Sequence, residues 1–250
     1  MSRKEIFAGN WKMYKTHDEA LSLVQGLSEG LQKKENREII VFPPSPYAKA
    51  IVDACAGKNI SVGMQNMYFE KEGAFTGEVS PEMVKDTGCT HILIGHSERR
   101  HVFGETDEMV NKKVKTAFEY DLLPVVCVGE LLEEREANKT EAIVKKQVTE
   151  ALKDIDKEKA LKTVIAYEPV WAIGTGKVAT PEIAEETHAI IRKLISGLYS
   201  DDVANSIPIL YGGSVKPDNI SGLYTMENID GVLVGGASLK VDSFLQIINV

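Results

Sequence analysis

Short runs of apolar residues alternate with longer amphipathic segments along the whole chain of 250 residues. Eight runs have the length and the β-branched content of strands, and they cover residues 5–10, 38–42, 60–64, 91–95, 123–128, 163–167, 207–211 and 231–234. Between them lie segments with helical periodicity, among them 18–33, 106–120, 133–153 and 181–198. Two of these intervals contain Ser80-Pro81-Glu82 and Thr180-Pro181-Glu182, which are typical of helix N-termini. The pattern predicts eight consecutive strand-helix units.

The predicted strands are apolar on both faces, which indicates a sheet that is covered on both sides. Strict alternation of strand and helix predicts parallel pairing. A closed (β/α)8 barrel needs about 250 residues, whereas a doubly wound sheet usually has fewer strands and a nucleotide-type first turn. No linker-like stretch or shift of composition divides the sequence. We therefore predict one α/β domain over residues 1–250, a (β/α)8 barrel of eight parallel strands surrounded by helices.

The composition and net charge of the chain limit the kinds of molecule that it is expected to bind. With 43% hydrophobic and 26% charged residues, the chain is typical of globular proteins. A formal net charge of -8, with no block of basic residues, argues against nucleic acid. An anionic metabolite remains compatible with this charge, because salt screens charges that lie more than about 8 Å away. No apolar stretch reaches the roughly 18 residues of a membrane span, and the N-terminus has no signal-peptide pattern, so we expect no contact with a membrane.

The cysteines and histidines point to neither disulfides nor a metal. Cys55, Cys89 and Cys127 are odd in number and lack CxxC spacing, so we interpret them as buried, reduced thiols, as expected in the cytoplasm. The five histidines have no recognised metal-ligand spacing. We expect no metal and no cofactor.

Residues 163–177 combine a strand, a carboxylate and a loop. Pro169 fixes its own φ and favours extended geometry for Glu168, while Gly174 and Gly176 give the loop a pliable exit. A carboxylate at the mouth of a buried strand is desolvated when an apolar loop folds over it, and desolvation raises its basicity. The stretch thus predicts a general base beneath a lid. Taken alone, it fits a solvated carboxylate in an ordinary connection equally well.

Polar residues and glycines interrupt the apolar pattern at the C-terminal ends of the predicted strands. In a parallel barrel these ends share one face, where active sites are built. Each residue by itself has a structural explanation, as a turn former or a solvated cation, but their placement on one rim favours a site. The set comprises Asn10, Lys12, His96, Glu168, Gly212-Gly213-Ser214 and Gly235-Gly236.

The chemistry of this set has two halves. Glycine-rich turns after the seventh and eighth strands predict a phosphate site, because backbone N–H groups and a helix N-terminus favour a dianion. Opposite them, a carboxylate, an imidazole, an ammonium and an amide suit the removal of a proton next to a carbonyl, with stabilisation of the enediolate that forms. This reaction requires no hydride carrier, nucleophilic serine or metal.

The connection that runs from Gln65 to Val79 is unusually long and apolar. It carries aromatic and methionine side chains alongside glycines, a composition that indicates a functional or covered loop. Two interpretations remain open: a partner subunit covers it, or it folds onto its own barrel.

Five segments together resemble the signature sequences of the triosephosphate isomerase family, and the likeness runs from the first strand to the last helix. The resemblance implies a TIM barrel that interconverts dihydroxyacetone phosphate and glyceraldehyde 3-phosphate through an enediol(ate), in glycolysis and gluconeogenesis, without a cofactor. The segments are Ala8-Gly9-Asn10-Trp11-Lys12-Met13, Gly95-His96-Ser97-Glu98-Arg99-Arg100, Ala166-Tyr167-Glu168-Pro169-Val170-Trp171-Ala172-Ile173-Gly174-Thr175-Gly176, Tyr211-Gly212-Gly213-Ser214 and Gly231-Val232-Leu233-Val234-Gly235-Gly236-Ala237-Ser238-Leu239.

The resemblance also implies a role for each residue, known for the family and not worked out from spacing. The resemblance implies that Glu168 is the base and that His96 is the electrophile. Lys12 is implied as the cation that holds the negative charge of the substrate, and Asn10 as a group that orients the substrate. Glu98 is implied to support these residues without touching the substrate. The implied substrate and phosphate contacts are Asn10, Lys12, Gly174, Ser214, Gly235 and Gly236. The implied lid comprises Pro169, Val170, Trp171, Ala172, Ile173, Gly174, Thr175, Gly176 and Lys177.

The family further implies a homodimer in which the loop from Gln65 to Val79 enters the neighbouring subunit and Thr76 reaches its site. One departure is Leu131, which stands where a small hydroxyl residue is common in the family and so puts a helix-start contact in doubt. Two rival functions are a different phosphate-binding barrel enzyme and a non-catalytic barrel that binds phosphorylated sugars or proteins. The combination of Asn10, Lys12, His96 and the Glu168 lid argues against the first, and the presence of Glu168 and His96 argues against the second.

Overall fold

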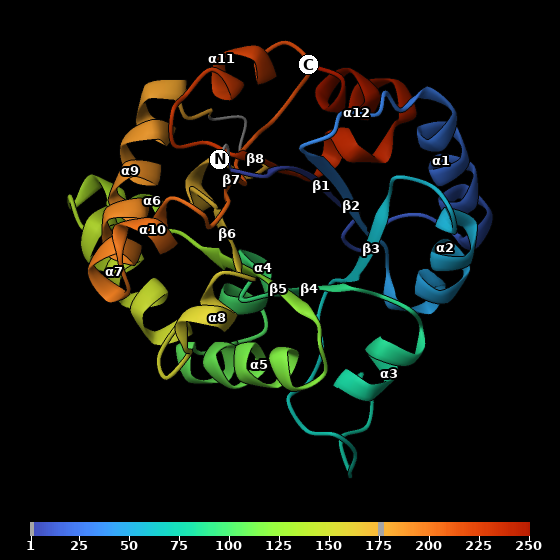
Figure 1. Ribbon diagram of the computed structural model, residues 1–250, viewed down its shortest axis with the longest axis horizontal. Helices are drawn as coiled ribbons and strands as arrows, with labels where there is room; N and C mark the ends of the chain where they lie inside the picture. The colour runs from blue at the N-terminus through green and yellow to red at the C-terminus, as the bar shows by residue number, and fades with distance from the viewer. Residues whose placement is uncertain (1–2, 175–177) are drawn as a thin grey trace.

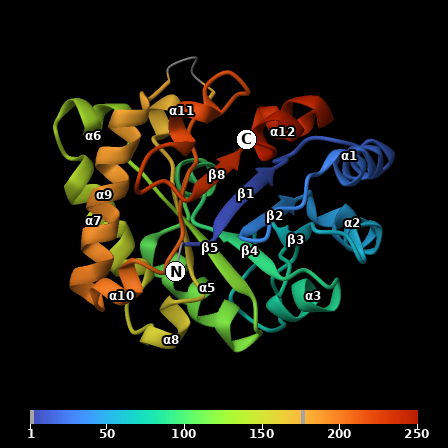
Figure 2. The ribbon, with the colours of Figure 1, turned by 45° about the horizontal axis from the view of Figure 1, so that its top comes forward.

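Figure 1 shows a computed structural model of the protein, which describes residues 3–174 and 178–250. Eight parallel strands pair in chain order and close into a barrel, with the last strand against the first, as predicted. β1 and β8 lie side by side where the barrel closes (Figure 2). The strands are β1 (Glu5–Asn10), β2 (Arg37–Phe42), β3 (Ser61–Met64), β4 (His91–Ile94), β5 (Leu123–Val128), β6 (Val164–Tyr167), β7 (Ile209–Tyr211) and β8 (Gly231–Val234).

Helices form a ring around the barrel (Figure 1). In the described ranges the α-helices are α1 (His17–Gly30), α2 (Ala48–Cys55), α3 (Pro81–Asp86), α4 (Ser97–His101), α5 (Asp107–Glu119), α6 (Leu132–Glu136), α7 (Thr140–Ala151), α8 (Lys157–Ala160), α9 (Pro181–Leu198), α10 (Asp201–Ala204), α11 (Ile220–Tyr224) and α12 (Val241–Ile248). Short 3-10 turns are η1 (Ser45–Tyr47), η2 (Val170–Ala172) and η3 (Gly236–Leu239). None of the helices in those ranges has both the length and the apolar character that crossing a bilayer requires.

The two predicted helix starts are confirmed. Ser80 accepts a hydrogen bond from the backbone N–H of Met83, and Thr180 accepts one from Ile183, so each hydroxyl satisfies a donor that the first helical turn leaves free. The predicted strands are confirmed to within two residues at each end.

The prediction of a single helix over residues 133–153 is wrong, because the chain forms two helices there, α6 and α7. Asn138, in the connection, has φ 56°, a left-handed conformation that ends a helix and that asparagine tolerates better than most residues. Lys139 then begins α7 as its N-cap. The helical periodicity runs through the break, which is why the pattern alone did not show it.

The core has two layers, because successive side chains of each strand point to opposite faces. One layer fills the barrel interior with residues such as Ile6, Ala8 and Phe42. The larger layer lies between the strands and the helices and includes Phe7 and Trp11. Burial on both faces explains why the strands read as continuous apolar runs.

The loop from Gln65 to Val79 projects outward beside α3, beyond the ring of helices (Figure 1). Tyr68 packs against Phe69 and Phe75, with ring centroids 4.2 and 4.6 Å apart, and its backbone N–H donates to Val79 O at 2.8 Å. The loop is therefore internally ordered, yet all of its residues from 70 to 78 are exposed.

Candidate active site

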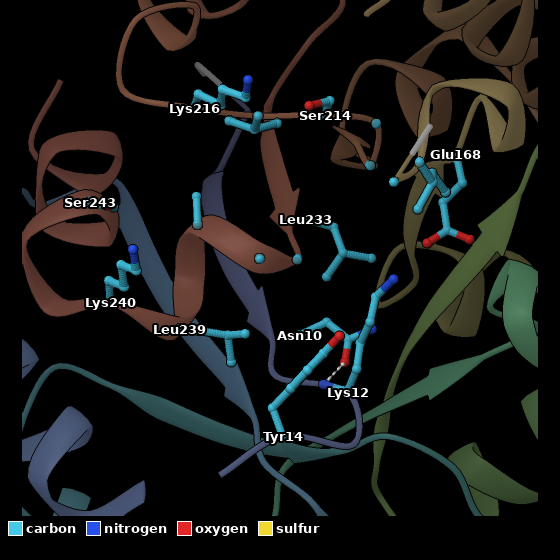
Figure 3. A pocket seen from close by; sticks show the side chains of 18 of the residues that line it. Asn10, Lys12, Tyr14, Glu168, Ser214, Lys216, Leu233, Leu239, Lys240 and Ser243 are labelled. Carbon is cyan, nitrogen blue, oxygen red and sulfur yellow. Dashed lines mark hydrogen bonds between the residues drawn. The ribbon is translucent and has the colours of Figure 1, made fainter. Parts of the chain in front are cut away.

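A cavity of about 840 Å³ opens at the C-terminal ends of the strands (Figure 3). It gathers residues from β1, β4, β6, β7 and β8 that are far apart in the sequence. Of the residues predicted for the site, those that line it are Asn10, Lys12, His96, Glu98, Glu168, Ile173, Gly174, Gly212, Gly213, Ser214, Gly235 and Gly236. Closure of the barrel thus brings the predicted carboxylate, imidazole, ammonium and glycine turns to one cavity.

Asn10 and Lys12 enter the cavity from the end of β1. Lys12 has φ 51°, a conformation that costs about 1–2 kcal/mol for a residue with a side chain. Two hydrogen bonds hold it: its N–H donates to Asn10 Oδ1 at 3.0 Å, and its carbonyl accepts from Gln65 Nε2 at 2.8 Å. Figure 3 shows the resulting direction of the Lys12 side chain, which extends into the cavity. Its Nζ lies 2.6 Å from Glu98 Oε1.

His96 is the N-cap of α4, and this position fixes its tautomer. Its Nδ1 accepts the backbone N–H of Glu98 at 3.2 Å, so the ring proton of the neutral imidazole resides on Nε2. Nε2 lies 3.1 Å from Glu168 Oε1. The helix N-terminus therefore presents a neutral N–H donor to the cavity.

Glu168 directly follows β6 and is almost fully buried, with 2% of its surface exposed. Besides the contact with His96, its Oε2 accepts the backbone N–H of Ser97 at 2.9 Å. Glycines make room for it: a Cβ on Gly129 would lie 1.8 Å from Glu168 O, and a Cβ on Gly212 would lie 2.8 Å from Glu168 Cγ. The carboxylate thus accepts one backbone hydrogen bond and contacts the imidazole, and it must leave at least one of these partners to reach another.

The opposite wall is made of the turns that follow β7 and β8. Ser214, Gly235 and Gly236 line the cavity there. A Cβ on Gly235 would lie 3.6 Å from Lys12 Cε, and a Cβ on Gly236 would meet nothing within 4 Å. The absence of side chains therefore opens backbone to the cavity close to the stem of Lys12.

The predicted lid is described only in its first part. Val170 to Ala172 form η2, and the backbone N–H of Val170 donates to Glu130 O at 3.1 Å. Ile173 lines the cavity beside Gly174, which has φ 69°. Pro169 and the three residues of η2 do not line it. The predicted lid residues Thr175, Gly176 and Lys177 lie outside the described residues.

Sequence reasoning missed Glu130 as a site residue. Its buried carboxylate accepts hydrogen bonds from Tyr167 Oη at 3.1 Å, from Trp171 Nε1 at 2.9 Å and from Arg135 at 3.2 Å. Glu130 thereby ties the first part of the loop to β6. Its signal was available, since Gly129-Glu130 directly follows a predicted strand in the same way as the other site residues.

The doubt raised by Leu131 concerns the start of α6. The backbone N–H of Leu131 donates to Glu134 Oε2 at 2.8 Å, which is one half of a capping box. The other half needs a side-chain acceptor at residue 131, and leucine has none. α6 therefore begins with half of the reciprocal contact.

In the described part of the chain, no group of three or more His, Cys, Asp or Glu side chains is placed to hold a metal ion.

Comparison with known proteins identifies the family. The family profile described as triosephosphate isomerase matches residues 5–250. Proteins named triosephosphate isomerase from Carboxydothermus hydrogenoformans and Roseiflexus sp. are 52% and 51% identical over 247 residues, which cover 99% of this chain and 98% and 97% of theirs. One from Caldanaerobacter subterraneus is 53% identical and is covered to 99%. Because these matches run from the first strand to the last helix, the chain belongs to the triosephosphate isomerase family.

Proposed function

We propose that this protein interconverts dihydroxyacetone phosphate and glyceraldehyde 3-phosphate, a step of glycolysis and gluconeogenesis. The relatives above bear the name of the enzyme with this activity. The observation that carries the proposal is the contact of Glu168 Oε1 with His96 Nε2 at 3.1 Å, in a cavity that also contains Lys12 and the glycine turns. A carboxylate base, a neutral donor and a cation that converge on one small substrate are what proton transfer beside a carbonyl requires.

In the proposed reaction, the substrate phosphate binds at the wall formed by Ser214, Gly235 and Gly236. This places the carbon chain towards Glu168 and His96. The carboxylate releases its contacts with His96 and Ser97, removes a proton from the hydroxyl-bearing carbon and returns it to the carbonyl carbon. The hydroxyl proton passes to the former carbonyl oxygen, so that the hydroxyl and carbonyl groups exchange places. Small residues at the phosphate end support this orientation, because they let backbone donors approach the dianion.

The same step creates negative charge on the substrate oxygens. His96 would donate Nε2–H to the carbonyl oxygen, supported by the Glu98 N–H that keeps the proton on that nitrogen. Lys12 would balance the charge of the enediolate and the phosphate, and Asn10 would orient the oxygen atoms. The left-handed backbone of Lys12 is strain of the kind that concentrates at functional sites.

The loop from Pro169 to Lys177 would act as the lid. An enediolate phosphate loses inorganic phosphate in water, so an isomerase has to exclude water until the intermediate is reprotonated. Binding of the unreactive phosphate would drive closure and so contribute to the stabilisation of the transition state. The bonds that Glu130 makes to Val170 and Trp171 support a fixed first hinge for this motion.

A different phosphate-binding barrel enzyme is the nearest rival, because the fold alone does not select a reaction. The test is turnover of dihydroxyacetone phosphate by the purified protein in an assay that couples formation of glyceraldehyde 3-phosphate to a dehydrogenase. Absence of turnover would overturn the proposed function. The variant Glu168→Gln should lose more than about 10²-fold in kcat and still bind inorganic phosphate. Near-normal turnover by that variant would exclude Glu168 as the base.

We also propose that the protein is a homodimer. The support is the resemblance to the family together with exposed apolar side chains on three segments: Met13 beside the site, Phe75 in the long loop and Val102 after α4. A loop with Thr76 at its exposed tip fits insertion into a second copy. Sedimentation equilibrium would detect a mass of two chains, and a monomer at micromolar concentration would refute the assembly.

The proposed compartment is the cytoplasm. Cys55, Cys89 and Cys127 are all free thiols in buried positions, which suits a reducing environment. Cell fractionation that recovers the protein with secreted material would contradict this assignment.

A further inference from the structure

Arg100 lies behind the imidazole half of the site, and the proposed reaction does not use it. It belongs to α4, the short helix that His96 caps, and only 8% of its side chain is exposed. A small space beside α4 is lined by Ser97, Arg100 and Glu168, so the arginine stands next to the segment that holds the base. Burying a charged group costs free energy unless its donors are paired. The partners of Arg100 therefore indicate what this position requires.

Arg100 binds both peptide groups that flank His96. Its side-chain Nε–H donates to the carbonyl of Gly95 at 2.7 Å, and its backbone N–H donates to the carbonyl of His96 at 3.0 Å. The first carbonyl belongs to the peptide that enters His96, and the second belongs to the peptide that leaves it. One residue therefore fixes the chain on each side of the Cα that carries the imidazole.

Gly95 turns the chain out of β4, and its conformation requires support. Its φ is 72°, in the left-handed region that favours glycine. A Cβ at Gly95 would lie 2.8 Å from Arg100 Nη2 and 3.0 Å from Val110 Cγ2. The N–H of Gly95 donates to Glu105 Oε1 at 2.9 Å. A carboxylate thus binds the donor of this glycine and a guanidinium binds its acceptor, and hydrogen bonds to ionised groups are the stronger kind.

The guanidinium is itself anchored on two neighbouring elements. Nη1 donates to Asp107 Oδ1 at 2.7 Å in the first turn of α5, and Nη2 donates to the carbonyl of Cys127 on β5 at 3.3 Å. The next carbonyl of β5, that of Val128, accepts from Glu168 on the β6 side, so the carbonyl of Cys127 points towards β4. Because β4 has already ended at this level, Arg100 supplies the donor that a longer β4 would have provided.

We propose that Arg100 is a positioning residue for His96: it ties the peptides around this histidine to α5 and β5 and so keeps Nε2 at the observed 3.1 Å from Glu168 Oε1. The inference rests on the proposed isomerase function and adds to it a residue that acts through the backbone of His96. Without the guanidinium, the carbonyl of Gly95 loses its donor, and the imidazole can move relative to the substrate carbonyl. The glycine turns of the opposite wall follow β7 and β8, so the phosphate end should be spared.

Three variants test this role. Arg100→Met keeps a stem of similar length and removes the side-chain donors, while Asp107 retains Lys146 Nζ at 3.7 Å as a partner. Arg100→Lys keeps the charge and loses the planar fork that reaches two carbonyls at once. Arg37→Met is the matched control. Arg37 is also buried, with 2% of its side chain exposed, and donates to the carbonyl of Val250 at 3.1 Å, but it begins β2 at the opposite end of the barrel.

The first readout compares kcat with inhibition by inorganic phosphate, both measured per mole of folded protein. We expect kcat of Arg100→Met to fall by about tenfold or more, because a misplacement of about 1 Å at a reacting group costs up to about 10²-fold. Arg100→Lys should lose about threefold. The inhibition constant for inorganic phosphate should stay within about twofold of the wild type in both variants. Arg37→Met should keep the kcat of the wild type and unfold at a lower temperature, since it leaves carbonyls without a donor.

The second readout does not depend on turnover. Nitrogen-15 NMR of protein labelled at its five histidines reports the tautomer and the hydrogen bonds of each ring, and His96→Gln identifies the signals of His96 by removing them. We expect these signals to shift in Arg100→Met and to keep their wild-type positions in Arg37→Met. An arginine that only stabilises the fold would lower the unfolding temperature without moving the signals of His96.

The outcomes separate the inference from the function on which it rests. A wild type without isomerase turnover overturns the proposed function, and the NMR comparison then decides the role of Arg100 by itself. Unchanged His96 signals in folded Arg100→Met overturn the inference. With an active wild type, so does a kcat of Arg100→Met close to that of the wild type, an equal loss of kcat in Arg37→Met, or a loss of phosphate inhibition as large as the loss of kcat.

The lysine variant decides if the methionine variant does not fold. A fall of kcat in Arg100→Lys of about threefold or more, with shifted His96 signals and unchanged phosphate inhibition, supports the positioning role. Either the kcat of the wild type or unshifted His96 signals in that variant overturns it.

Discussion

One methyl group at Gly212 tests whether Glu168 acts from the position that the barrel gives it. A Cβ at Gly212 would lie 2.8 Å from Glu168 Cγ and 3.2 Å from the carbonyl of Tyr167. Gly212 is not among the glycines with positive φ, so alanine adopts its backbone conformation without strain. Gly212→Ala is therefore a steric perturbation aimed at the stem of the proposed base.

The size of the effect follows from the distances. To restore an ordinary contact, the Glu168 stem has to retreat by roughly 0.6 Å, and a misplacement of about 1 Å at a reacting group costs up to about 10²-fold in rate. We therefore expect kcat to fall by about tenfold, which corresponds to about 1.4 kcal/mol of transition-state stabilisation. The same displacement disturbs the contact of 3.1 Å between Glu168 and His96.

The assay is steady-state turnover of dihydroxyacetone phosphate, with thermal unfolding measured on the same preparation. Gly197→Ala is the matched control, because a Cβ on Gly197, within α9, would meet nothing within 4 Å. The control should keep its kcat and unfold at an equal or higher temperature, since alanine favours a helix interior over glycine. If Gly212→Ala keeps kcat within twofold of the wild type and folds normally, Glu168 does not act from the observed position.

Three further outcomes are expected. Lys12→Met should weaken inhibition by inorganic phosphate by about tenfold or more, because hydrogen bonds to charged groups contribute about 1.5–3 kcal/mol; unchanged inhibition would remove Lys12 from the anion site. Leu131→Ser should stabilise the protein by about 1 kcal/mol in chemical denaturation, because serine supplies the acceptor missing from the cap that Glu134 half completes; no gain would mean that the N-terminus of α6 is already satisfied. Burial raises the pKa of Glu105, but the ammonium of Lys113 and other donors outweigh it and hold the pKa below the ordinary 4.5. This carboxylate thus stabilises the fold fully above pH 4.5 and loses its effect as the pH falls through the lowered pKa. Glu105→Gln should therefore flatten the decline of the melting temperature below pH 4.5; an unchanged decline would contradict the assignment.

The strands were predictable from the local pattern of apolar residues. The face of the barrel that carries the site was predictable because parallel strands that close into a barrel all end on one face. Apolar runs locate strands that are buried on both sides, and parallel closure places their C-terminal ends on one face. Asn10, His96 and Glu168 therefore lie in the cavity where the sequence predicted them. Neither inference requires knowledge of which side chains touch.

The features that escaped prediction depend on a local backbone angle or on contacts between distant segments. The periodicity of residues 133–153 continues through Asn138, and only its positive φ separates α6 from α7. The placement of Glu130 after a predicted strand was visible in the sequence, but its role in holding the loop appears only in the bonds that Tyr167 and Trp171 donate to it. His188 reads as one polar residue in an amphipathic helix, and its contacts with two strand ends are visible only in the folded chain.

The register of the barrel explains why glycines flank Glu168. Tyr167 pairs with Val128 on β5 and with Tyr211 on β7, so the next residues on the three strands, Gly129, Glu168 and Gly212, lie at one level.

The backbone bonds continue at that level, since Glu168 N donates to Val128 O and Gly212 N donates to Tyr167 O, each at 2.7 Å. A side chain at either neighbouring position would occupy the space of the Glu168 backbone or of its stem. The position of the carboxylate is therefore set by three adjacent strands that end together. In the sequence, Gly212 was interpreted only as part of a phosphate turn; the register adds that its missing side chain makes room for the proposed base.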